Sequence, residues 1–308
     1  GSGGQTVTQG SQVDVPDSAP VITGSSTENT LTINAEKDQT ANVTLSGANI
    51  DVSGAGKAAV STTGEGSVSI ELDGDSTLKS GNHHAGLEKH NGGSLTIADE
   101  DENGKLTAEG GSDGAGIGGG FKGNGNNIAI TGGEVKATGG LNGAGIGGGL
   151  RGKGKDITVS GDAKLKVQGG GEDDYDGAGA GIGNGGSCDE RAIPTPGAEV
   201  EPDTSDLLTT GWIEYYAPGV DMEKDKPEKT TVGTLPPQEK PVEPIEPAVP
   251  EQPEAERGAA APLYRVTAKD GRDIAYTAEQ KGGVLTVTVD EDLAILTGRL
   301  SGIRTLKA

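Results

Sequence analysis

Aromatic residues are scarce in this chain, which contains one Trp, one Phe and five Tyr among 308 residues. Hydrophobic residues make up only 31% of the sequence, well below the apolar share of an average globular domain. This shortage excludes a bulky core of the sandwich or α/β type. Glycine, in contrast, occupies 56 positions, so a packed fold has to be thin, regular and rich in turns.

Cysteine, positive charge and long apolar runs are also in short supply. Cys188 is the only cysteine, which excludes a disulfide framework and a thiolate zinc site. The 25 Lys and Arg are outnumbered by 47 Asp and Glu, giving a net charge of −22. A nucleic-acid partner needs a basic surface and is therefore not expected. No apolar run approaches the roughly 20 residues of a membrane-spanning helix, so no membrane span is expected.

A glycine-rich hexapeptide marks an internal repeat. Ala-Gly-Ile-Gly-Gly-Gly occurs at residues 115–120 and 144–149, and Ala-Gly-Ile-Gly-Asn-Gly at 180–185. Degenerate copies begin at Ala58 and Ala85, so the first alanines of successive copies are 27, 30, 29 and 36 residues apart. The sequence is therefore organised as repeats of about this length.

Two further blocks recur with the same period, and both alternate apolar with polar or small residues. The first consists of triplets that begin at Val43, Val68, Leu95, Ile128 and Ile157. The second consists of triplets that begin at Leu106, Val135 and Leu165, with earlier copies expected at Ile50 and Leu78. Such alternation is typical of a β-strand with one buried face. Each repeat therefore contains three short strands.

Three strands per repeat, joined by glycine-rich turns, predict an all-β fold. We expect a right-handed parallel β-helix with three sides and about five to six coils across residues 30–190, its coils stacked at about 4.8 Å. Similar side chains should then lie over one another in the interior, with Leu106 on Val135 on Leu165 and Ala115 on Ala144 on Ala180. On the outside, opposite charges should alternate along Lys105, Glu134 and Lys164, which is mildly stabilising.

The residues outside the repeat form four further segments. Residues 1–29 are a low-complexity segment or cap, and residues 191–222 are expected to cap the last coil, because a solenoid end exposes its core. Residues 223–262 hold nine of the fifteen prolines, interleaved with Glu, and are expected to form an extended linker. Residues 263–308 read as a partial β module, with strands expected at 264–267, 273–276, 284–289 and 293–297. We expect neighbouring domains of a longer chain.

The turn that begins at Asp99 carries oxygen ligands at the spacing of the first half of a calcium loop. The ligands would be the side chains of Asp99, Asp101 and Asn103 and the backbone carbonyl of Lys105. Calcium is thus the one cofactor that the sequence suggests. Gly110 stands where such a loop has its bidentate Glu, and a solvated acidic turn is the alternative.

Other polar groups carry weaker signals. The acidic insertion at residues 172–176 lacks a defined ligand spacing. The three histidines, His83, His84 and His90, could hold a metal only if they converged, and adjacent side chains on a strand point to opposite faces. Corner residues without a metal are the favoured reading.

The aromatic residues concentrate at residues 212–216, where Trp212, Tyr215 and Tyr216 are candidate ligand residues for stacking on sugar rings. Their alternative role is to cap the solenoid. For catalysis, Asp51, Lys79, Lys136 and Lys166 are expected to share one outward column. It contains a single carboxylate, whereas glycosidic-bond chemistry of this type uses grouped carboxylates or a base. The chain is therefore not expected to be an enzyme.

The Ala-Gly-Ile-Gly-Gly-Gly corners, together with residues 128–133 and 137–140, resemble glycine-rich parallel β-helix repeats in surface proteins of anaerobic Firmicutes. They are distantly similar to pectin-lyase-like bacterial carbohydrate-binding β-helix proteins, some of which bind calcium. That family often has Asp-Gly-Ile where this chain has Ala115-Gly116-Ile117. The resemblance covers residues 40–187 and implies an extracellular or cell-surface location in a bacterium.

Two functions follow as hypotheses. The first is a non-catalytic carbohydrate-binding or adhesive module that contacts a polysaccharide or host glycan along a flat face. The second is a structural stalk or spacer of a surface protein. A polysaccharide lyase-like enzyme is the least favoured reading.

Overall fold

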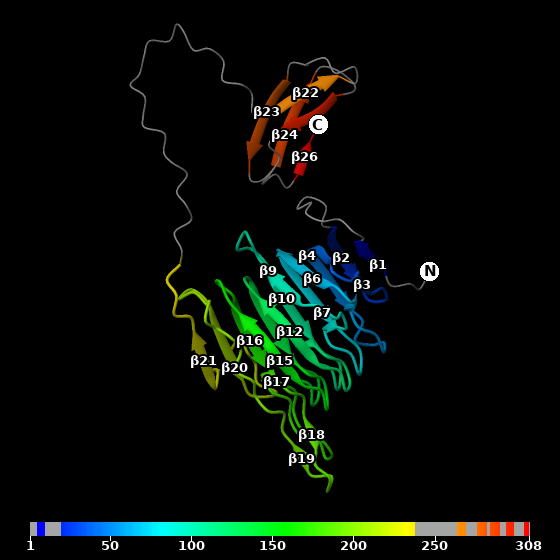
Figure 1. Cartoon of the computed structure of the whole chain (residues 1–308), viewed down its shortest axis with the longest axis vertical. Coiled ribbons are helices and arrows are strands. Elements are labelled where there is room, and N and C mark those ends of the chain that lie inside the picture. Colours follow the sequence, from blue (N-terminus) through cyan, green and yellow to red (C-terminus); the bar gives the residue numbers. More distant parts are fainter. Residues whose placement is uncertain are drawn as a thin grey trace. The chain divides into compact units, whose positions relative to one another are not determined.

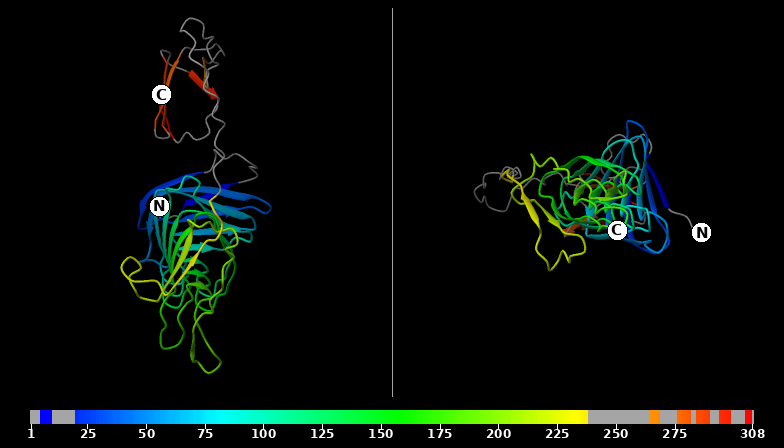
Figure 2. Two further views of the ribbon diagram at one scale, coloured as in Figure 1. Left: turned by 90° about the vertical axis from the view of Figure 1, so that its left-hand side faces the viewer. Right: turned by 90° about the horizontal axis from the view of Figure 1, so that it is seen from below.

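The computed structural model describes residues 5–9 and 20–237, and the backbone of five strands between residues 264 and 307. The chain divides into two compact units, Gly1–Glu239 and Lys240–Ala308. The first unit is a parallel β-solenoid of stacked three-stranded turns (Figures 1 and 2). The described residues contain no helix. The predicted fold class is confirmed.

Each turn of the solenoid contributes one strand to each of three faces. The first face stacks, in order, β1(Gln5–Gln9), β3(Leu31–Ala35), β5(Val60–Gly64), β8(Leu87–Lys89), β11(Ile117–Gly118), β14(Ile146–Gly147) and β17(Ile182–Gly183). The second face stacks the first part of β4(Thr40–Asp51), β6(Ser67–Asp73), β9(Leu95–Ala98), β12(Gly125–Ile130) and β15(Gly154–Val159). The third stacks the end of β4, β7(Asp75–Lys79), β10(Lys105–Glu109), β13(Glu134–Thr138), β16(Lys164–Gln168) and β20(Trp212–Tyr216).

The second and third faces are continuous through β4. Residues 40–46 of β4 pair with β6, and residues 49–51 pair with β7. Gly47 lies between the two parts and has a φ of +62°, a conformation that glycine adopts without steric cost. The chain therefore turns a corner inside one long strand.

Interior columns form as the sequence predicts. Leu106 pairs with Val135, and Val135 pairs with Leu165, in adjacent parallel strands. All three are at most 1% exposed, and burial of each such side chain contributes about 1.5–3 kcal/mol. The registers of β11, β14 and β17 likewise bring the three repeat alanines into one column, which consists of Ala115, Ala144 and Ala180.

Two of the expected alignments were wrong by two residues. Val43 pairs with Ile70 instead of Val68, and Leu78 pairs with Ala108 instead of Leu106. A shift of two residues keeps every side chain on the same face, because the strand period is two. Apolar alternation therefore fixes which residues are buried, but it does not fix the register.

The parallel stack extends on both sides of residues 30–190. β1 pairs with β3, and β2(Val21–Ser26) pairs with β4. At the other end, β20 pairs in parallel with β16, and parallel bridges join Asp203 to Thr158 and Leu207 to Gly161. Leu207 and Ile213 are fully buried. The segment from β17 to β20 thus forms an irregular turn that covers the fifth regular one.

Short strands complete the description. β18(Ser187–Cys188) pairs antiparallel with β19(Pro194–Thr195), and β21(Lys229–Val232) pairs antiparallel with β20. In the second unit, β22(Tyr264–Ala268) pairs with β25(Ala294–Gly298), while β24(Val284–Val289) pairs with β23(Tyr276–Lys281) and β26(Thr305–Lys307). The strand expected at 273–276 lies at 276–281. Residues 238–262, most of the expected linker, lie outside the described residues.

Candidate functional site

The acidic turn after β9 is built around the carboxylate of Asp99. Its Oδ1 accepts a hydrogen bond from the backbone N–H of Asn103 at 3.2 Å, and its Oδ2 accepts one from Gly104 at 2.9 Å. The Asn103 Oδ1 atom accepts a bond from Gly74 N–H at 3.3 Å. Lys105 begins β10, and its ammonium pairs with Glu134 at 3.1 Å. Two of the predicted calcium ligands thus already satisfy backbone amides.

The structure adds a carboxylate that the sequence pattern did not include. Ligand oxygens of Glu71, Asp99 and Asp101 lie within 4.8 Å of one another. Glu71 belongs to the previous turn and accepts a bond from Glu100 N–H at 2.7 Å. Burial raises the pKa of Glu71, and the charges of Glu100, Asp99 and Asp73 raise it further. A hard cation with oxygen ligands would relieve this repulsion.

The three histidines divide between two carboxylates. His84 Nδ1 lies 2.9 Å from Glu88 Oε2, and His90 Nε2 lies 2.5 Å from Glu88 Oε1. His83 instead pairs with Asp113 at 2.7 Å. The adjacent His83 and His84 therefore have different partners, but they lie in the turn before β8, so the expectation that they sit on a strand was wrong.

Glu88 has a structural role that its sequence position did not reveal. Its Oε2 accepts the N–H of Ala85 at 2.8 Å. In the next turn, the equivalent N–H of Ala115 donates to the backbone carbonyl of Gly119 at 3.0 Å. The Glu88 carboxylate thus replaces a turn carbonyl and is only 4% exposed.

Charge pairing keeps Glu88 ionised in this buried position. Burial alone would raise the pKa of Glu88, but bonds from His90, Ala85 N–H and His84 together hold it below its usual value. The hydrogen bond to Glu88 raises the pKa of His90. The Glu88–His90 pair is therefore sensitive to pH.

The predicted aromatic ligand residues lie in the last strand of the third face. Tyr215 and Tyr216 are 7% and 6% exposed, whereas Trp212 is partly exposed. The Tyr216 hydroxyl donates a hydrogen bond to the Glu214 carboxylate at 2.7 Å. Burial is the larger cause and this hydrogen bond the next one, and they raise the pKa of Tyr216 to about 12. Burial also raises the pKa of Tyr215. Both tyrosines are buried, and of the three residues Trp212 alone is partly exposed.

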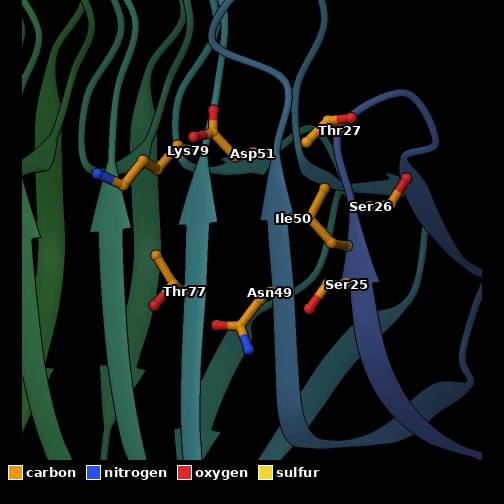
Figure 3. Close-up of a pocket in the computed structure, with 8 residues that line it drawn as sticks. All are labelled: Ser25, Ser26, Thr27, Asn49, Ile50, Asp51, Thr77 and Lys79. Atoms are coloured by element: carbon orange, nitrogen blue, oxygen red, sulfur yellow. The ribbon is translucent and has the colours of Figure 1, made fainter.

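A groove of about 400 Å³ crosses the outer side of the third face at the N-terminal end. Ser25 of β2, Asn49 of β4 and Thr77 of β7 are register partners in three neighbouring strands and form one row across it (Figure 3). Asp51 and Lys79 are also register partners and form a second row. The lining thus combines hydroxyls, an amide and two charged groups with the aliphatic side chain of Ile50.

The charged groups of this groove are held in place by local partners. Asp51 Oδ1 accepts bonds from the Ser53 hydroxyl at 2.6 Å and from Ser53 N–H at 3.1 Å, and both lower the pKa of Asp51. Lys79 pairs with Glu109 at 2.9 Å, which raises the pKa of Lys79. The groove therefore presents fixed polar groups.

The single outward column expected through Asp51, Lys79, Lys136 and Lys166 was wrong. Lys79 is in register with Glu109, whereas Lys136 and Lys166 are in register with Thr107 in a different row. The cause is the two-residue register shift between β7 and β10. Glu223 bridges the other two lysines, at 3.4 Å from Lys136 and 2.7 Å from Lys166.

Comparison of the chain with protein-family models, with curated proteins and with solved structures finds no match. Within the described residues, no helix has the length and apolarity needed to cross a membrane. The geometry of the solenoid surface is thus the basis for a functional proposal.

Proposed function

We propose that this chain is a non-catalytic carbohydrate-binding or adhesive module of a secreted or cell-surface bacterial protein. The observation that carries the proposal is the open groove of Figure 3, where Ser25, Asn49 and Thr77 form a row across three parallel strands. Neighbouring strands are about 4.8 Å apart. The row therefore offers hydrogen-bonding groups at regular steps to the hydroxyls of an extended glycan.

The chemistry of the groove favours binding over bond cleavage. Hydrolysis of a glycosidic bond commonly uses two carboxyl groups, one of them held protonated by a raised pKa. Asp51 is the carboxylate that lines this groove, and its pKa is lowered. Its bonds to Ser53 suit an ionised, fixed acceptor rather than a proton donor.

A glycan array probed with the full chain tests the proposal. We expect binding that weakens about tenfold in the Asn49→Ala, Thr77→Ala double variant, since each lost hydrogen bond costs about 0.5–1.5 kcal/mol. The Thr138→Ala, Thr158→Ala double variant is the control, because Thr138 lies two strands beyond Lys79 on the same face and Thr158 lies on the second face. Equal loss in both variants would contradict the groove as the binding surface.

A structural stalk is the second candidate, and the regularity of the stack favours it. The interior columns continue without interruption from β10 through β16 to β20, as a rigid spacer requires. A stalk would show no glycan binding on the array. It would also retain its function when the groove residues are replaced.

A further inference from the structure

Positive charge is concentrated in two turns of this acidic solenoid. Residues 115–160 contain five Lys or Arg and two Asp or Glu, a net charge of +3, whereas the whole chain carries −22. Local potential of opposite sign to the net charge is a feature of sites for charged ligands. Lys136 pairs with Glu223 on the third face, so the other four cations define the surface that suits an anion.

Four of these cations lie at the corner that leads into the second face or at the start of its last strand, β15. We call Lys122, Arg151, Lys153 and Lys155 the basic strip, and all four are exposed. Their two turns are directly stacked, because Lys122 N–H donates to Leu150 O at 2.9 Å and Lys153 N–H donates to Asn124 Oδ1 at 2.8 Å. Lys122 and Arg151 also share a left-handed backbone conformation, with φ of +57° and +60°.

Two cations of the basic strip are neutralised and two are available. Arg151 forms a two-pronged ion pair with Asp176 at 3.0 and 3.1 Å, and Lys155 pairs with Asp156 at 3.2 Å. Within residues 20–237, Lys122 and Lys153 show no ion pair with a carboxylate. These two ammonium groups are thus free to bind a ligand.

An exposed aromatic ring accompanies the available cations. Phe121 is 42% exposed, and Lys122 Nζ lies 4.8 Å from its ring centroid. The ring of His83, in the preceding turn, lies 5.3 Å from the Phe121 ring and is tilted by 50°. Phe121 is thus held in place by its neighbours while part of its ring faces solvent.

We propose that the basic strip binds an anionic polysaccharide that contains uronic acids. Carboxylates of two acidic sugars pair with Lys122 and Lys153, and a sugar ring of the same chain packs against the exposed part of Phe121. Duplex DNA is disfavoured because it presents one charge per about 1.7 Å of axis, which the net charge of −22 repels. A uronate polymer carries one carboxylate per acidic sugar, and the site does not depend on the groove of Figure 3.

Binding of the full chain to alginate, measured by calorimetry in EDTA, tests the site. We expect the Lys122→Gln, Lys153→Gln variant to bind about five- to tenfold more weakly, given about 0.2–1 kcal/mol for each exposed ion pair. The Lys37→Gln, Lys57→Gln variant makes the same charge change at exposed lysines elsewhere and should bind within twofold of wild type. Phe121→Ala should weaken binding with an unchanged salt dependence.

If alginate does not bind, or if both lysine variants bind it equally weakly, the basic strip is not the binding site. Dextran, a neutral polymer, should not bind there, and binding of duplex DNA that competes with alginate overturns the choice of ligand. If neutral glycans bind and only the Asn49→Ala, Thr77→Ala variant weakens their binding, the proposed function holds and the proposal for the basic strip is wrong.

Discussion

The Glu88 carboxylate accepts a hydrogen bond from the backbone N–H of Ala85 at 2.8 Å. In later turns a backbone carbonyl group accepts the equivalent hydrogen bond. The equivalent bonds run from Ala115 to Gly119 and from Ala144 to Gly148, both at 3.0 Å. The later turns have a glycine-rich loop at this corner, whereas this one has Glu88 held between two histidines. The same hydrogen bond is thus preserved by different chemistry.

Replacement of Glu88 should therefore destabilise the solenoid. Glu88→Ala leaves the buried Ala85 N–H without an acceptor, which costs about 1–3 kcal/mol, and Glu88→Gln should cost less because an amide oxygen remains. Thermal and urea unfolding measure the effect. Glu65→Ala, at an exposed position, is the control, and a Glu88→Ala protein as stable as this control would contradict the structural role.

The Glu88–His90 pair should make stability depend on pH. The lowered pKa of Glu88 contributes stability above its usual value of 4.5, which is lost as pH falls through the folded pKa. The raised pKa of His90 contributes stability below its usual value of 6.5, which is lost as pH rises through the folded pKa. The difference in Tm between wild type and His90→Asn should be largest between these values. A difference that stays constant into alkaline solution would contradict the pair.

Gly147 should tolerate no side chain. Its φ is +135°, and an added Cβ would fall well inside the van der Waals distance of the Gly183 carbonyl oxygen in the next turn. Gly147→Ala should destabilise by about 3 kcal/mol or more, through strain and displacement of the stacked turn. Gly54→Ala is the matched control, because nothing lies within 4 Å of its added Cβ. A similar Tm for the two variants would refute the close stacking at this corner.

Calcium should stabilise the turn that contains Asp99 and Asp101. Millimolar calcium is expected to raise the Tm of wild type by mass action, and the Glu71→Gln, Asp101→Asn variant should lose this shift. Asp38→Asn, at an exposed turn, should retain it. An equal shift in both variants, or none in wild type, would favour a solvated acidic turn.

The sequence predicted the strands and the interior columns because apolar alternation reports burial directly. Leu106, Val135 and Leu165 carry that signal, and glycines mark the corners between them. The registers of Val43 and Leu78 were beyond this reasoning, since a shift of two residues leaves the alternation unchanged.

Contacts between turns were the other part that the sequence did not reveal. Glu71 meets Asp99 from 28 residues away in the sequence, and no local motif connects them. The last turn also lacks the glycine repeat, so the sequence indicated only an aromatic cluster at Trp212 and did not predict the strand there. Phe121 gave no signal alone, because its significance depends on the lysines stacked beside it.

Disulfide formation between engineered cysteines tests the stacking of turns most directly. In a Cys188→Ser background, Lys105→Cys with Glu134→Cys places two thiols on register partners, at a Cα separation within the range of about 4.4–6.8 Å that a disulfide spans. We expect rapid disulfide formation in this pair and none for Lys105→Cys with Lys164→Cys, two turns apart. A disulfide in the second pair but not in the first would contradict the solenoid register.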